Sequence, residues 1–100
     1  MTESLMVSEM ESAAVATAPR VSLESMEAKI AKIDYLYHKH LTICIIEMQN
    51  GFFVVGESAP ASVANFNAQL GRKFAYENAV RQLWKLEGYA LRETLSKGAI

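Results

Sequence analysis

Hydrophobic and polar positions divide the chain beyond residue 20 into three patterned segments. In the first, apolar side chains recur at steps of three, four and three residues, as on one face of a helix. These are Leu23, Met26, Ile30 and Ile33. Ser22 directly precedes them and is a residue type that caps helix N-termini. The pattern predicts a short helix over residues 23–34, followed by an aromatic connection over residues 35–39.

The second segment, residues 41–56, is apolar and reverses direction at Asn50-Gly51. Asn-Gly supplies the positive φ angles of a two-residue type I′ turn, which predicts an antiparallel hairpin. Such a turn sets Met48 opposite Phe53 and Ile46 opposite Val55. One face then holds Cys44, Ile46, Met48, Phe53 and Val55, and the other holds Leu41, Ile43, Ile45 and Val54.

A two-stranded hairpin is marginal in water, and this one is apolar on both faces. A helix can cover one face, and a second subunit or the N-terminal segment must then cover the other. We therefore predict a homo-oligomer, a dimer or higher. The predicted oligomer contact consists of Ile46, Met48, Phe53 and Val55. The alternative is a monomer whose helices cover both faces.

The third segment predicts a long helix capped by Ser62 or Asn65, with a bend near Gly88 and a short final helix to about Ser96. Its apolar positions are Phe66, Leu70, Phe74, Ala79, Val80, Leu83 and Trp84. The predicted fold class is therefore α+β. It consists of a short N-terminal helix, a two-stranded antiparallel hairpin, and a long C-terminal helix with a bend and a short final helix.

Composition places this fold in one small domain. Of the 100 residues, 51% are hydrophobic and 21% charged, which is typical of a globular chain. Residues 1–20 are rich in Ser, Ala, Met and Glu and are interpreted as a flexible tail, with a frayed helix as the alternative. Residues 21–100 form the single small α+β domain. One cysteine, no basic-then-apolar leader and no long apolar run predict a cytoplasmic protein without a membrane segment.

Catalytic and metal-binding patterns are weak. His38, His40 and Cys44 alternate and would share one face of an extended strand, with side chains that zinc accepts. The competing interpretation is a buried small cysteine with two histidines at a strand start. Ser58 lacks the surrounding motif of a nucleophile and is interpreted as a turn or capping residue. We assign no catalytic residue, no metal and no cofactor.

A mild excess of basic residues marks the C-terminal part of the chain. Residues 61–100 carry six Lys and Arg against three Glu, a local charge of +3. The predicted binding residues lie where the second strand ends and the long helix begins: Glu57, Asn65, Arg72 and Lys73. Arg72 is the favoured one, because its planar guanidinium can hold a carboxylate or phosphate at two points. The alternative is a solvated helix face.

Several motifs resemble those of a family of small tailed-phage and prophage proteins. They include the hairpin around Asn50-Gly51-Phe52, Gly56-Glu57-Ser58, Gly71-Arg72-Lys73 and Trp84-x-Leu86-Glu87-Gly88-Tyr89. The resemblance covers about residues 21–96. Family members usually have proline directly after the tryptophan, where this chain has Lys85. The last two helices can therefore run on as one.

The resemblance implies a phage accessory protein that works in the host cell cytoplasm, and it implies no established reaction. We therefore expect a non-enzymatic protein that binds or sequesters a host component, in host takeover or anti-defence. The partner would be a host protein or an anionic small molecule such as a signalling nucleotide. The alternative is a nucleic-acid-binding accessory protein, favoured only by the local positive charge.

Overall fold

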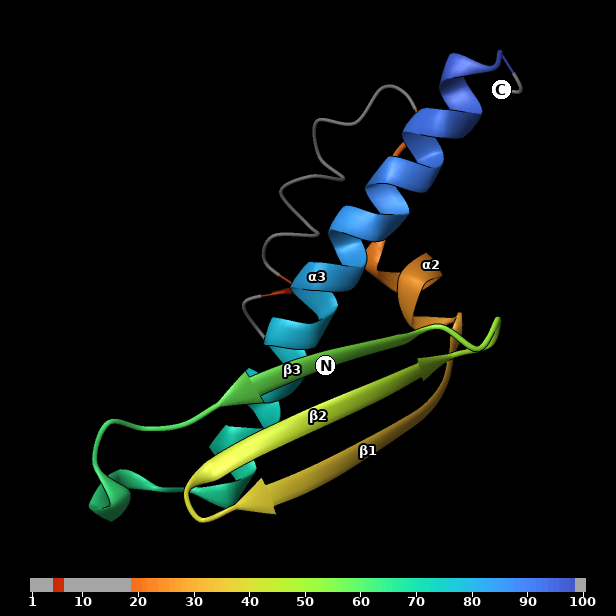
Figure 1. Cartoon of the computed structure of the whole chain (residues 1–100). Coiled ribbons are helices and arrows are strands. Elements are labelled where there is room, and N and C mark those ends of the chain that lie inside the picture. The colour runs from red at the N-terminus through yellow and green to blue at the C-terminus, as the bar shows by residue number, and fades with distance from the viewer. Residues whose placement is uncertain (1–4, 7–18, 99–100) are drawn as a thin grey trace.

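The computed structural model describes residues 5–6 and 19–98 of the chain. The described elements, in chain order, are helix α2 (Leu23–Glu27), strands β1 (Ile30–His38), β2 (Leu41–Met48) and β3 (Phe53–Ser58), 3-10 helix η1 (Val63–Asn65) and helix α3 (Ala68–Ser96). The strands form one antiparallel sheet in the order β1-β2-β3. Helix α3 crosses one face of this sheet and continues well past it (Figure 1).

The predicted α+β class is confirmed, but the sheet has three strands rather than two. The predicted helix over 23–34 ends at Glu27, and β1 begins at Ile30. Ile30 and Ile33 fit the helical spacing, yet Ile and Tyr favour strands, and β2 pairs with β1 along its length apart from a bulge between Ile30 and Lys32. The spacing of apolar residues within this segment carries no information about its pairing with β2.

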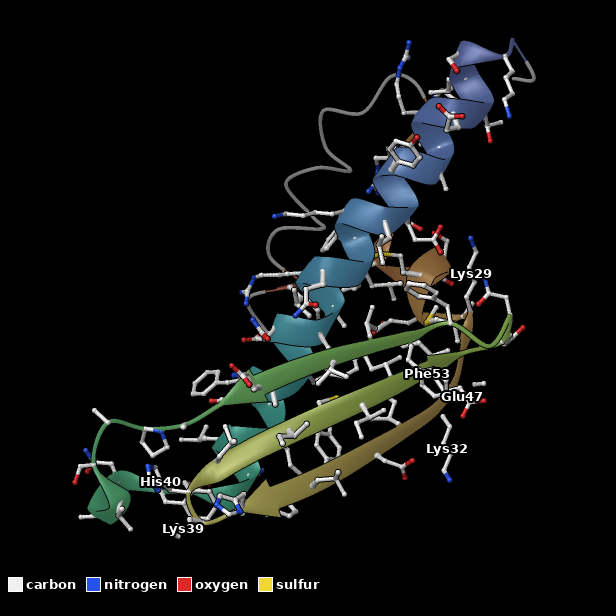
Figure 2. The ribbon with its side chains drawn as sticks, viewed as in Figure 1. Lys29, Lys32, Lys39, His40, Glu47 and Phe53 are labelled. Carbon is white, nitrogen blue, oxygen red and sulfur yellow. The ribbon has the colours of Figure 1, made fainter. Side chains whose placement is uncertain are left out.

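The connections between the strands follow local chemistry. Ser22 caps α2 as predicted, with its hydroxyl accepting a hydrogen bond from Ser25 N at 3.1 Å. Strands β1 and β2 are joined by Lys39-His40, and Lys39 has a left-handed φ of 53°. Figure 2 shows both residues at this turn, at the opposite end of the sheet from Phe53.

The turn between β2 and β3 contains Asn50-Gly51, as predicted, but it is one residue longer. Met48 N donates to Phe52 O at 2.8 Å and Gly51 N donates to Met48 O at 2.9 Å, so three residues, 49–51, form the loop. Gly51 has φ 89°, the left-handed geometry of a three-residue loop with a bulge. The predicted strand register is therefore wrong by one residue, and Glu47, not Met48, pairs with Phe53.

That slip reverses the faces of β3, because strand side chains alternate between the two sides of a sheet. Val54 is buried with Ile46 and Met48 beneath the helices. Phe53 and Val55 lie on the opposite face and are 56% and 48% exposed. The prediction that Ile46, Met48, Phe53 and Val55 share one face is therefore wrong.

The core lies between the sheet and the helices. Its buried apolar residues are Leu5, Leu23, Met26, Cys44, Ile46, Met48, Val54, Ala75, Tyr76, Ala79, Val80 and Leu83. Leu5 falls within the segment predicted to be a tail, and it is 2% exposed. The rest of that prediction rests largely on residues 1–4 and 7–18, which lie outside the described ranges.

Helix α3 differs from its prediction in three respects. Its cap is Asn67, which accepts from Leu70 N at 3.0 Å, rather than Ser62 or Asn65. The helix runs from Ala68 to Ser96 without ending at Gly88, so the predicted separate final helix is absent from it. Its buried side includes Ala79, Val80 and Leu83 as predicted, whereas Leu70 and Phe74 are each 47% exposed.

Candidate tyrosine–arginine binding surface

Helix α3 packs mainly against β3 and β2, which leaves the outer strand β1 less covered on the helix side. Side chains of β1 that point to this side include Tyr35 and Tyr37, opposite Cys44 and Thr42 of β2. Arg72 and Tyr76 approach them from α3. We call these four residues, Tyr35, Tyr37, Arg72 and Tyr76, the tyrosine–arginine surface.

The guanidinium of Arg72 is positioned by β1. Its Nη1 donates a hydrogen bond to the Tyr37 hydroxyl at 3.1 Å, and this bond raises the pKa of Arg72. Tyr37 itself is 48% exposed. A guanidinium has five N–H donors in a planar fork, so one bond to tyrosine leaves most of them available for an anion. The adjacent phenol rings add flat apolar area.

The inner members of the surface, Tyr35 and Tyr76, are less exposed than Tyr37. Tyr76 is 8% exposed and donates its hydroxyl to a Glu27 carboxylate oxygen of α2. Burial and this bond to the carboxylate raise the pKa of Tyr76 far above its ordinary value. Burial also raises the pKa of Tyr35, and the neighbouring Cys44 raises it further. Tyr35 and Tyr76 therefore remain protonated at neutral pH and act as hydrogen-bonding groups.

Cys44 has the properties of a packing residue. Its side chain is fully buried on the helix side of β2, and burial raises its pKa to about 11. His38 pairs with Leu41 across the turn and lies on the other side of the sheet, so His38 and Cys44 do not share a face. Among the described residues, no group of three His, Cys, Asp or Glu side chains could hold a metal ion.

The four residues predicted from sequence to form a binding site are placed separately. Arg72 and Lys73 lie in the first turns of α3, and Asn65 ends η1. Glu57 lies on β3 with its exposed side chain on the face away from the helices, while its backbone N–H donates to Asn78 Oδ1 at 3.0 Å. Arg72 and Lys73 are therefore neighbours on α3, whereas the Glu57 side chain lies on the face of the sheet that points away from α3.

Sequence reasoning missed the two tyrosines of β1, Tyr35 and Tyr37, that lie beside Arg72. The alternation Tyr35-x-Tyr37 is a signal for two side chains on one face of a strand. The sequence analysis did not use this alternation, because it predicted residues 35–39 to be a connection that follows a helix. Glu27 and Tyr76 lie 49 positions apart and meet only when α2 and α3 come together.

A second candidate surface is the groove between the β2–β3 turn and α3. Its volume is about 470 Å3, and its apolar lining includes Phe52, Leu83 and Leu86. Lys29 and Glu87 both line it and form an ion pair at 3.1 Å. Figure 2 shows Lys29 near the end of α2, close to this turn. The groove offers apolar area but little unpaired charge, so it is less suited to an anionic partner.

These features describe a small α+β protein with a three-stranded antiparallel sheet and a long C-terminal helix. The chain belongs to the phage protein (N4 Gp49/phage Sf6 gene 66) family, whose model it matches over residues 3–95. The predicted phage-family membership is thus confirmed. No curated protein and no solved structure gave a match. Within the described part of the chain, no helix is long and apolar enough to span a membrane.

Proposed function

We propose that this phage-family protein is a non-enzymatic accessory protein that binds and sequesters an anionic host component in the host cytoplasm. The observation that carries the proposal is the Arg72 guanidinium, held at 3.1 Å by Tyr37 beside further phenol rings. Charge-assisted hydrogen bonds to a carboxylate or phosphate are stronger than neutral ones, and an aromatic ring can stack on a nucleobase. A nucleotide combines both groups.

The state of Cys44 supports stoichiometric binding over catalysis. A thiol reacts as its thiolate, and a buried thiol with a pKa of about 11 is almost entirely protonated at neutral pH. The raised pKa values of Tyr35 and Tyr76 have the same consequence for their phenols. These groups support a surface that holds a partner and does not transform it.

Affinity capture from phage-infected host lysate tests the proposal, with mass spectrometry of both the bound proteins and the released small molecules. We expect an anionic partner on the intact chain and much less on Arg72→Ala. The loss of one charge-assisted bond should weaken binding by roughly 1–3 kcal/mol. Arg72→Lys should recover only part of it, since lysine lacks the planar fork.

Arg92→Ala is the matched control, because Arg92 is an exposed arginine near the far end of the same helix. It should retain the partner at the level of the intact chain. Circular dichroism should show both alanine variants folded. Equal capture by the Arg72 and Arg92 variants would contradict a role for the tyrosine–arginine surface. Salt-sensitive retention of DNA by all variants would instead favour the nucleic-acid alternative.

A further inference from the structure

The outer edge of β1 has no strand beside it in the described part of the chain. β1 is nine residues long and lies at the end of the order β1-β2-β3 (Figure 1). The backbone N–H and C=O groups along such an edge can pair with another strand. Native proteins commonly cover, charge or shorten an edge of this length.

Apolar side chains are exposed on both sides of this edge strand. Leu36 is 52% exposed on the open face, and Tyr37 and Ile33 are 48% and 38% exposed on the helix side. A strand added to the edge would shield Leu36 and Ile33. The described core is small, so this additional burial would be a large relative gain.

Two opposite charges on β1 restrict the register in which a second copy of the chain could pair with it. Lys32 and Asp34 are two residues apart on the open face, and their charged groups lie 3.5 Å apart. Their side chains are 65% and 53% exposed. Figure 2 shows Lys32 in line with Glu47 and Phe53 across the three strands. A partner strand would therefore meet both charges directly at the edge.

In an antiparallel pair of β1 strands, the position of the two-fold axis decides which charged residues face each other. An axis at Asp34 sets the two aspartates opposite each other, and an axis at Tyr35 sets Lys32 opposite His38. An axis at Ile33 sets each Lys32 opposite the partner's Asp34, which makes two opposite-charge pairs. Directly opposed unlike charges stabilise a sheet and like charges destabilise it. Among these registers, only the axis at Ile33 pairs Lys32 with Asp34, so charge complementarity favours it.

We propose that β1 pairs with β1 of a second copy of this chain about a two-fold axis at Ile33. The dimer then has one continuous six-stranded antiparallel sheet, with both α3 helices on the same face. This contact differs from the hairpin contact expected from sequence. The contact uses the backbone edge and the open-face charges of β1, whereas Arg72 is held by the Tyr37 side chain on the helix side. The dimer is therefore independent of the proposed function.

Sedimentation analysis of the full chain over a wide concentration range tests the dimer. We expect a species of twice 11.1 kDa that dissociates on dilution. Lys32→Asp and Asp34→Lys each place like charges opposite each other at two positions. Each should weaken the dimer by about tenfold or more. The double swap Lys32→Asp/Asp34→Lys restores both pairs and should return the dissociation constant close to that of the intact chain.

Glu57→Lys is the control, since it also changes charge on the open face but lies on β3. It should leave the dimer unchanged, and circular dichroism should show every variant folded. A monomer at all concentrations would overturn the proposal and assign Lys32 and the bulge near Ala31 to edge protection. The register would be overturned if the charge swaps left the dimer dissociation constant unchanged, or if Asp34→Lys lowered it.

Discussion

Gly56 shows most directly how one residue sets the packing of this protein. A Cβ at Gly56 would lie 2.2 Å from Ala75 O and 2.3 Å from Ala79 N, both backbone atoms of α3. The absence of a side chain at Gly56, together with two small residues on the helix, lets α3 approach β3 closely. This contact also determines where Arg72 lies, because it is part of the same rigid helix.

Gly56→Ala should therefore destabilise the fold. The clash is with backbone, which cannot rotate away, so the helix must shift as a whole. We expect a loss of about 1–3 kcal/mol in the free energy of unfolding, measured by urea denaturation. Gly88→Ala is the matched control, because a Cβ there meets nothing within 4 Å. It should raise stability by up to about 1 kcal/mol, since alanine is the better helix former. An unchanged Gly56→Ala stability would contradict the close approach.

The β2–β3 hairpin is the element in which a small local difference has the largest consequence. Asn50 and Gly51 form the turn in either geometry, but the observed loop includes Gln49 as a third residue. Asn50 Oδ1 accepts from Phe52 N at 2.9 Å, which supports the longer loop. One extra loop residue moves Val54 into the core and Phe53 out of it.

Paired lysine substitutions test this register. Val54 is 6% exposed, so Val54→Lys should unfold the protein or cost roughly 3 kcal/mol or more, because it buries an unpaired charge. Phe53→Lys should cost less than about 1 kcal/mol, because the Phe53 side chain is 56% exposed. Thermal unfolding followed by circular dichroism distinguishes the two. The two-residue turn would give the opposite ranking.

The Cys44 thiol and the phenols of Tyr35 and Tyr76 make the stability of the whole molecule depend on pH. Folding raises the pKa of Cys44 from 9.0 to about 11 and raises those of Tyr35 and Tyr76 above their ordinary value of 10.0. The folded chain therefore holds these protons at pH values where the unfolded chain releases them. Their contribution to stability is complete below about pH 9 and decreases as the pH rises above it.

The melting temperature should accordingly be nearly constant from pH 7 to 9 with respect to these groups and fall steadily above pH 9. Tyr76→Phe has no phenol to titrate, so its melting temperature should start lower but decline less steeply between pH 9 and 11. Calorimetry across this range provides the measurement. Parallel declines for the two proteins would show that Tyr76 does not contribute to the pH dependence.

The sequence by itself determined the features that depend on near neighbours. Ser22 caps a helix, residues 41–48 form a strand, the chain turns at Asn50-Gly51, and a long helix follows. Each depends on interactions within a few residues of the chain. The family motifs were likewise readable as sequence, and the family match confirmed them. Arg72 was foreseen as a candidate binding residue, whereas its tyrosine partner on β1 was not.

Only the tertiary structure decided the third strand, the faces of β3 and the surroundings of Arg72. Residues 30–33 fit a helical period as well as a strand, and pairing with β2 resolved the choice. The faces depend on one loop residue, which no hydrophobic pattern encodes when both faces are apolar. The bond between Tyr37 and Arg72 joins residues 35 positions apart. Contacts of that range arise from packing, because local preference acts over only a few residues and cannot specify which distant surfaces meet.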